Sequence, residues 1–157
     1  MAMDERSQAR ALALQALCIF DALGDDFRLQ LDGFLTDPTN HADLDWPDPP
    51  TPRVIGLART LAAGAWEIRT RSDELLVAHA AGWPIDRMQP VDRSILRLGV
   101  FELLQRSEVP PAVAISEALV LAARFGGNES TAFVNGVLDA VRRAMLPGDA
   151  AKPTDNE

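Results

Sequence analysis

The sequence has a single cysteine, Cys18, no tyrosine, and no run of hydrophobic residues long enough to span a membrane. One cysteine excludes an intrachain disulfide and a cysteine-rich zinc site. The two histidines, His41 and His79, have no third ligand at a spacing that would predict a metal site. Residues 1–10 are polar and carry two acids, which excludes a signal peptide. We therefore expect a soluble cytoplasmic protein without a metal or a cofactor.

Enzyme motifs are also missing. Gly126-Gly127 has neither the lysine nor the preceding strand of a phosphate-binding loop. No serine, histidine and aspartate occur in a local hydrolase motif, and the acidic residues of the expected helices are spread out. The sequence therefore predicts a binding protein rather than an enzyme.

The charge of the 157-residue chain is uneven. The formal net charge is −8, but residues 21–50 alone hold eight aspartates and one arginine. Residues 51–146 hold eleven arginines and ten acidic residues. A local basic face outside the acidic segment is therefore compatible with the net charge. Arginine also suits such a face, because its planar guanidinium makes forked contacts with phosphate.

Helical periodicity dominates the chain, and alternating strand patterns are hard to find. We expect an all-α fold of about seven helices in two small bundles, within one domain over 1–146. The subdomains would cover about 1–82 and 83–146, with an acidic, proline-rich loop over 37–52 and a disordered tail over 147–157. The expected helices cover roughly 4–23, 27–35, 53–69, 73–81, 90–109, 112–125 and 129–145.

Several residues carry local expectations. Gly24 should end the first helix. Ser72-Asp73 should cap the helix that follows it, and Asn128 should be the N-cap of the last helix. Trp83 is most simply a packing residue, because of its large apolar area. In the helix that begins near Pro90, three charged residues fall largely off the apolar stripe: Arg93, Arg97 and Glu102.

Three linked motifs then point to a family. The runs VDRSILRLGVFELL (91–104), VPPAVAISEALVLAARFGG (109–127) and ESTAFVNGVLD (129–139) follow one another in order. Together they resemble the NusB family of transcription antitermination factors. Weaker similarity extends back to ARALALQALCIFD (9–21), so the resemblance covers roughly residues 9–145.

The resemblance implies RNA binding. Members of this family bind the boxA segment of nascent RNA and help RNA polymerase read through terminators, chiefly on ribosomal RNA operons. The residues that match the RNA-binding positions are Arg6, Arg10, Gln15, Glu129, Phe133 and Asn135. Two departures stand out: Ser7, Gln8 and Ala9 separate the arginines where the family has a denser arginine run, and Cys18 replaces a common aromatic residue.

The resemblance also implies a protein partner, a small ribosomal-subunit protein called NusE in its transcription role. The matching partner surface would consist of Asp92, Arg93, Arg97, Glu102, Ser116 and Glu117. Ser116 stands where the family usually has asparagine, so its side chain has a shorter reach. Some family members resemble dimers, which leaves a homodimer open.

Two other interpretations remain. The chain could be a protein-interaction module of the same fold that has weak or lost RNA binding, as the sparse arginines near residue 6 suggest. The same helical domain also resembles the RNA-docking part of some ribosomal RNA cytosine methyltransferases. This chain ends at Glu157, which leaves no room for a catalytic domain, so we expect no methyl transfer.

Overall fold

The computed structural model describes residues 3–80 and 82–146, and within these ranges it contains helices and no β-strand. This confirms the all-α class. The α-helices are α1 (Glu5–Leu23), α2 (Leu31–Thr36), α3 (Pro38–His41), α4 (Pro52–Glu67), α5 (Arg69–His79), α6 (Pro90–Gln105), α7 (Pro111–Phe125) and α8 (Ser130–Met145). Short 3-10 helices cover Gly24–Gln30 (η1), Ala42–Leu44 (η2) and Ile85–Arg87 (η3). The expected disordered tail over 147–157 lies outside the described residues.

The helices form two compact units that divide between Arg69 and Thr70. This division comes earlier in the chain than the boundary expected between about 1–82 and 83–146. The boundary falls at the start of α5, directly after α4 ends at Glu67, and Gly82 lies within the second unit. We describe each unit by itself.

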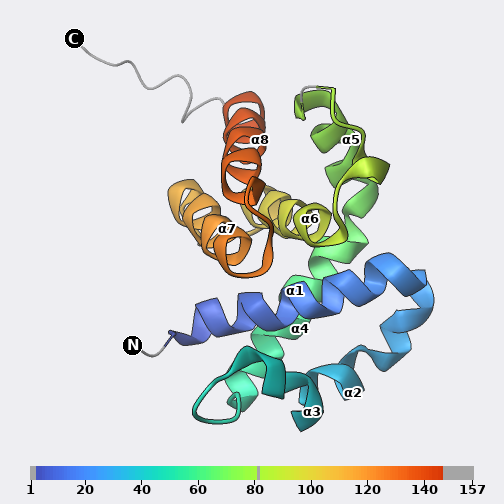
Figure 1. The fold of residues 1–157 in the computed structure, drawn as a ribbon, viewed down its shortest axis with the longest axis vertical. Coiled ribbons are helices and arrows are strands. Elements are labelled where there is room, and N and C mark those ends of the chain that lie inside the picture. The colour runs from blue at the N-terminus through green and yellow to red at the C-terminus, as the bar shows by residue number, and fades with distance from the viewer. Residues whose placement is uncertain (1–2, 81, 147–157) are drawn as a thin grey trace. The chain divides into compact units, whose positions relative to one another are not determined.

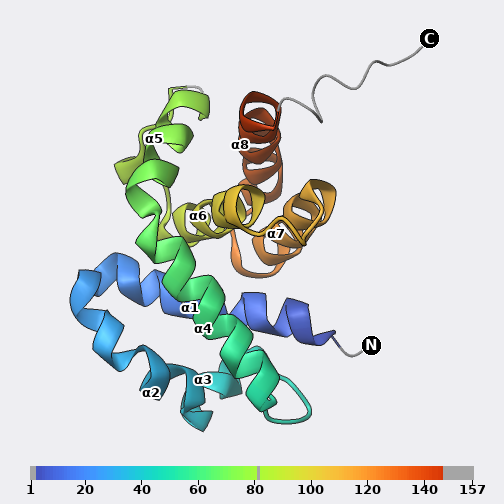
Figure 2. The same ribbon diagram turned by 180° about the vertical axis from the view of Figure 1, so that it is seen from behind.

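The first unit is built on α1 and α4, which cross each other (Figures 1 and 2). The carboxylate of Asp4 caps α1 by accepting a 2.8 Å hydrogen bond from the N–H of Ser7. As expected, Gly24 ends α1, with a φ of 77° that favours glycine. The buried residues of α1 are mostly alanines and leucines, and those of α4, which contacts α1, are Val54, Ala58, Leu61, Ala62, Ala65 and Trp66.

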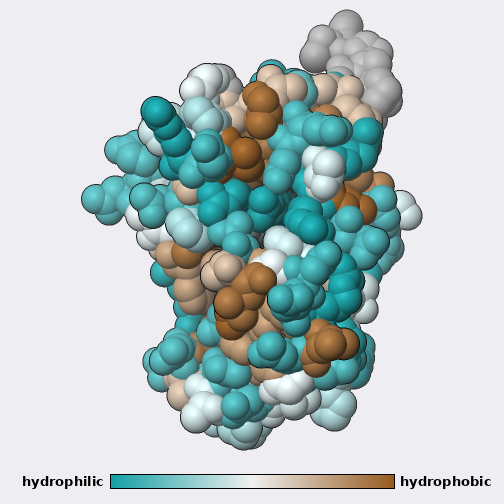
Figure 3. Space-filling model, turned by 90° about the vertical axis from the view of Figure 1, so that its right-hand side faces the viewer, coloured by the Kyte–Doolittle hydropathy of each residue, from teal (hydrophilic) through white to brown (hydrophobic). Residues whose placement is uncertain are grey.

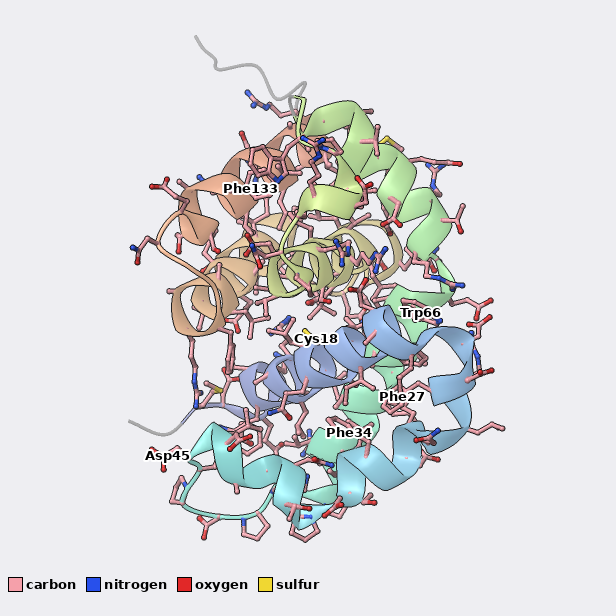
Figure 4. All side chains as sticks on the ribbon, turned by 45° about the vertical axis from the view of Figure 1, so that its right-hand side comes forward. Cys18, Phe27, Phe34, Asp45, Trp66 and Phe133 are labelled. Carbon is pink, nitrogen blue, oxygen red and sulfur yellow. The ribbon has the colours of Figure 1, made fainter. Side chains whose placement is uncertain are left out.

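Aromatic side chains extend this core toward η1 and α2 (Figure 4). The rings of Phe20 and Trp66 are stacked, with centroids 4.8 Å apart and an interplanar angle of 17°. Phe27 meets Phe20 edge-on at 4.9 Å and Phe34 edge-on at 5.7 Å. The indole N–H of Trp66 donates a 2.8 Å hydrogen bond to Asp25, so the polar end of this large side chain is also satisfied.

The segment over 37–52 is more structured than a simple loop. Asp37 caps the four-residue helix α3 by accepting a hydrogen bond from the N–H of Thr39, and η2 follows directly. Asp45 then adopts a left-handed conformation with a φ of 58°. The chain runs without helix from there until Thr51 caps α4. Short caps therefore organise the first half of the expected loop.

The second unit is built on α6, which contacts both α7 and α8. All residues of α6 from Ser94 to Leu103 are buried, so this helix has no solvent-exposed stripe over that stretch. The expectation that Arg97 and Glu102 lie off the buried face is therefore wrong: their exposed fractions are 8% and 2%. Gly99 allows α6 to approach α8 closely, because a β-carbon there would lie 2.7 Å from Leu138.

Two expected helix starts are also wrong. The helix α5 begins at Arg69 rather than after Ser72-Asp73. Ser72 is buried inside the helix, and Asp73 binds Arg97 of α6 instead of acting as a cap. The helix α8 begins at Ser130 with Glu129 in the N-cap position, one residue later than an N-cap at Asn128 would require.

The face of the molecule drawn in Figure 3 carries mostly hydrophilic side chains, with hydrophobic ones in separate patches.

Among the described residues, no helix combines the length and the apolar character that crossing a membrane requires. Residues 3–80 and 82–146 also contain no group of three histidine, cysteine or acidic side chains placed to hold a metal ion.

Candidate nucleic-acid interface

The N-terminal turn of α1 borders a hollow of about 750 Å³ in the first unit. Arg6 is exposed there, as an RNA contact would require. Glu5 accepts a 2.9 Å hydrogen bond from the Thr51 hydroxyl and lies 3.7 Å from the guanidinium of Arg53. The hollow is lined by Met3, Asp4, Glu5, Arg6, Arg53, Gly56 and Leu57. Two carboxylates therefore balance its two arginines, so the hollow has no net positive charge to attract phosphate.

The cap of α1 adds to this balance. The N–H of Ser7, which donates to the Asp4 carboxylate, is the main reason why the pKa of Asp4 lies below its ordinary value of 3.8. Asp4 therefore stays ionised beside Arg6 at neutral pH. One negative charge beside the arginine is fixed by the helix cap itself.

The other two residues matched on α1 are less accessible. Arg10 is buried, with an exposed fraction of 5%, so the expectation that it lies on an exposed helix start is wrong. Gln15 is half-buried, and its buried Oε1 has no hydrogen-bond partner within the described part of the chain. Of the three matched residues on α1, Arg6 alone is exposed.

A second hollow, of about 710 Å³, lies in the second unit. It is lined by residues from two stretches of the sequence, 83–92 and 127–133. Glu129 and Phe133, two of the predicted RNA contacts, line it together with Asp92. Trp83 and Arg87 also line it, although neither was predicted as a contact. The full set is Trp83, Arg87, Gln89, Asp92, Gly127, Asn128, Glu129, Ser130, Ala132 and Phe133.

Trp83 and Phe133 form an aromatic pair at this hollow. Their ring centroids are 6.3 Å apart and the ring planes meet at 62°. Trp83 is 54% exposed, so the expectation of a buried packing residue is wrong. Phe133, on α8 (Figure 4), is half-buried, which leaves part of its ring accessible. The signal for Trp83 was its place between Gly82 and Pro84, because such residues mark connections, and connections run over the surface.

The hydroxyl of Ser130 makes two hydrogen bonds, one to α6 and one to the turn before α8. The hydroxyl of Ser130 donates a 2.7 Å bond to Oδ1 of Asp92 and accepts a 2.9 Å bond from the N–H of Gly127. A β-carbon on Gly126 would lie 2.5 Å from the Ser130 hydroxyl oxygen and 2.7 Å from the Ala122 carbonyl oxygen. Gly126 thus permits the tight turn that places Glu129 and Phe133 at the hollow.

Arg93 fixes the segment between α5 and α6. Its Nη1 donates 2.9 Å hydrogen bonds to the carbonyl oxygens of Ile85 and Met88. These carbonyls flank Arg87, whose own N–H donates to the Pro84 carbonyl. Arg93 was expected on a protein-binding face, but the structure gives it this internal contact.

The remaining predicted partner residues separate into two groups. Asp92, Arg93, Arg97 and Glu102 are half-buried or buried, so they do not form an exposed face of mixed charge. Ser116 is exposed and Glu117 half-buried on α7. Val113 and Val120 of the same helix are 43% and 46% exposed. Asn135, the last predicted RNA contact, is exposed further along α8.

Comparisons with known proteins agree with this description. The model of the NusB family matches residues 7–143. The transcription antitermination protein NusB of Symbiobacterium thermophilum (strain DSM 24528 / JCM 14929 / IAM 14863 / T) is 43% identical over 141 residues, which cover 89% of this chain and 90% of that protein. The solution structure of NusB from Aquifex aeolicus is 26% identical, with a TM-score of 0.73 and coverage of 99% of this chain and 97% of that chain.

A crystal structure of the antitermination factors NusB and NusE in complex with dsRNA contains a chain of the same fold, with a TM-score of 0.69 and 24% identity. The structural match covers 90% of this chain and 98% of the chain in that crystal structure. Family model, sequence relatives and fold all agree over nearly the whole length. This chain belongs to the NusB family.

Proposed function

We propose that this chain is an RNA-binding transcription antitermination factor that acts in the cytoplasm. It pairs with the small ribosomal-subunit protein NusE, binds boxA-type single-stranded RNA, and supports transcription of ribosomal RNA operons by RNA polymerase. The observation that carries the proposal is the hollow of the second unit, where Glu129 and Phe133 lie together with Arg87. Proteins hold single-stranded RNA through such a combination of aromatic rings, arginine and polar groups.

The residues at this hollow have different roles in the proposal. Phe133 offers an apolar ring to an unstacked base. Arg87 contributes the positive charge for a phosphate or a plane for stacking. Glu129 repels phosphate, so its role is to accept a hydrogen bond from a base. On α1, Arg6 is the exposed residue that supplies a further phosphate contact.

The acidic charge of the chain supports the need for a basic partner. A net charge of −8 opposes RNA binding by the chain alone and favours association with a basic ribosomal protein. Ser116, with Val113 and Val120 exposed on the same helix, is the surface that we propose for NusE. The NusB chain crystallised with NusE and dsRNA has the same fold, which supports this pairing.

The test is transcription in vitro by RNA polymerase on a template that encodes boxA upstream of a terminator. We expect the chain together with NusE to increase the fraction of transcripts that pass the terminator. A template with a scrambled boxA is the matched control and should show no increase. Equal read-through on the two templates would refute the proposal.

One observation favours the alternative, a protein-interaction module with weak RNA binding. The hollow beside Arg6 contains as many carboxylates as arginines, and Arg10 is buried. On this alternative, calorimetry would show binding to NusE that boxA RNA neither strengthens nor weakens, and the transcription assay would show no effect.

A further inference from the structure

We infer that Trp83 is a further RNA contact, and that Trp83 and Phe133 together form a binding site for one unpaired base with an exocyclic amino group. This inference rests on the proposed function and deepens it, because it names the base class and assigns a residue that the family resemblance did not. It follows from four features of the hollow: the aromatic pair, its rigidity, its charge and its hydrogen-bond acceptors.

The aromatic pair presents two differently oriented surfaces. The planes of Trp83 and Phe133 meet at 62°, with 6.3 Å between the ring centroids, so they form a corner rather than a closed stack. Trp83 is 54% exposed and lines a hollow of about 710 Å³, which is roomy enough for a nucleotide. An exposed tryptophan beside a hollow is costly to hydrate, and a base laid on its face removes that apolar area from water.

The corner is held in place before any ligand binds. The backbone N–H of Trp83 donates a 3.0 Å hydrogen bond to the carbonyl of Ala80. Gly82, the residue before Trp83, has a φ of 80°. Further along the same connection, Arg93 donates to the carbonyls of Ile85 and Met88. A preorganised connection loses less conformational entropy when a ligand binds, which favours affinity.

The charge at the hollow selects the kind of ligand. Asp92 and Glu129 line it with one arginine, Arg87, so carboxylates outnumber cations. A phosphate is therefore not the group that enters most deeply, whereas an uncharged base is accepted. A basic side chain of a protein would pair with the carboxylates, but the positive charge of Arg87 would repel it. The guanidinium of Arg87 instead suits the phosphate attached to the base.

The acceptors select the base. One oxygen of Asp92 accepts the hydrogen bond from Ser130, which fixes the direction of this carboxylate, and Glu129 lines the hollow with an exposed side chain. Ionised carboxylates only accept hydrogen bonds. They therefore favour a base edge with an amino group, as in cytosine, over the carbonyl that uracil presents at the same position.

The test uses the full chain without NusE, at low salt, with two fluorescein-labelled probes: a cytidine hexanucleotide and a uridine hexanucleotide. Anisotropy of the label measures affinity, and quenching of tryptophan fluorescence reports stacking. Trp46 is half-buried and Trp66 buried, so quenching should come from Trp83. We expect the native chain to bind the cytidine probe more tightly than the uridine probe and to be quenched by it.

Three variants separate the outcomes. Trp83→Leu should weaken binding of the cytidine probe about tenfold, the typical effect of losing one stacked base. Trp83→Phe should retain most of the affinity but lose the quenching. Val77→Ala, which truncates another exposed apolar side chain of the same unit away from the hollow, should bind as the native chain does. Circular dichroism checks that each variant is folded.

The inference is overturned by unchanged affinity in Trp83→Leu, by quenching that persists in Trp83→Phe, or by equal affinity for the two probes. It is also overturned if Trp83→Leu impairs binding to NusE and leaves the RNA affinity unchanged. The proposed function fails separately, in the transcription assay, where a scrambled boxA would act like the natural one.

Discussion

The side chain of Arg97 on α6 makes a forked contact with Asp73 on α5, in which Nε and Nη2 each donate a 2.8 Å hydrogen bond to the carboxylate. Arg97 is nearly buried, and Asp73 is half-buried. This geometry matches the two donors of a guanidinium to the two oxygens of a carboxylate. Arg97 therefore holds α5 to α6 and does not belong to an exposed partner surface.

The first prediction concerns this ion pair. Asp73→Asn should lower the free energy of unfolding by about 3 kcal/mol, because it removes the negative charge that pairs with a buried guanidinium and accepts two of its hydrogen bonds. Chemical denaturation followed by circular dichroism measures the change. Asp32→Asn is the matched control: Asp32 bonds Arg59 at the exposed surface of the first unit, and its loss should cost less than about 1 kcal/mol. Equal effects of the two variants would contradict the structural role of Arg97.

The second prediction concerns two adjacent glycines. Gly126→Ala should lower the free energy of unfolding by about 1–3 kcal/mol, the usual cost of overpacking, because the new β-carbon would overlap Ser130 and the Ala122 carbonyl. Gly127→Ala should leave stability nearly unchanged, because nothing lies within 4 Å of a β-carbon there. Thermal unfolding of both variants tests this pair. A Gly126→Ala protein as stable as Gly127→Ala would mean that the turn is looser than described.

The third prediction concerns pH. The pKa of Asp4 is lower in the folded chain than its ordinary value of 3.8, so its ionised form stabilises α1 at higher pH. This contribution is fully present above the unfolded pKa and is lost as the pH falls through the lower, folded pKa. Asp4→Asn keeps a capping side chain but cannot titrate, so it should lose less stability than the native chain between about pH 5 and pH 3. Parallel pH profiles in urea denaturation would contradict the cap. Asp4→Ala, which removes the cap, should cost about 1 kcal/mol at pH 7.

The fourth prediction concerns Arg6. With NusE present, Arg6→Ala should weaken binding of boxA-like RNA and reduce the slope of log affinity against log salt by about 0.7, the value for one phosphate contact on a single strand. Arg71→Ala removes another exposed arginine, one that lines neither hollow, and should leave the slope unchanged. Fluorescence anisotropy at several salt concentrations measures both. Arg10→Ala is not a suitable test, because Arg10 is buried and its loss would also affect stability.

Several helix ends could be predicted from the sequence because their signals are local, although the predicted starts of α5 and α8 were wrong. Gly24 ends α1, and Pro90 occupies the first turn of α6, as expected. Pro111 was expected to precede its helix, and it is instead the first residue of α7. Phe125 is the last residue of α7, where the helix expected over 112–125 also ends. Each signal depends on a backbone restriction or on a missing N–H, and neither requires knowledge of the rest of the chain. Amphipathic periodicity then gave the all-α class for the same reason.

Burial of charged residues could not be predicted in this way. Arg97 is stabilised by Asp73, a residue on another helix, so the sequence near Arg97 contains no sign of its partner. Glu102 and Arg10 look like surface residues on a helical pattern, yet both are buried. Periodicity reports the average polarity of a helix face, whereas burial of an individual charge depends on tertiary contacts.

The candidate site was predicted in part. The family motif placed Glu129 and Phe133, and the structure shows them lining one hollow. Trp83 was assigned to the interior because tryptophan is usually a packing residue, but its position in a connection proved more informative than its residue type. Asp92 was assigned to a protein contact, and its hydrogen bond to Ser130 depends on the turn at Gly126-Gly127, which brings distant residues together.

The most direct test of RNA binding through the second unit is the affinity of boxA-like RNA for the chain with NusE, measured over a salt series for the native protein and for Phe133→Leu. Phe133→Leu keeps an apolar side chain and removes the ring, so we expect affinity to fall about tenfold at every salt concentration with an unchanged salt slope. Circular dichroism and calorimetric binding of NusE serve as controls for folding and pairing. Native affinity in a folded Phe133→Leu protein would contradict the account.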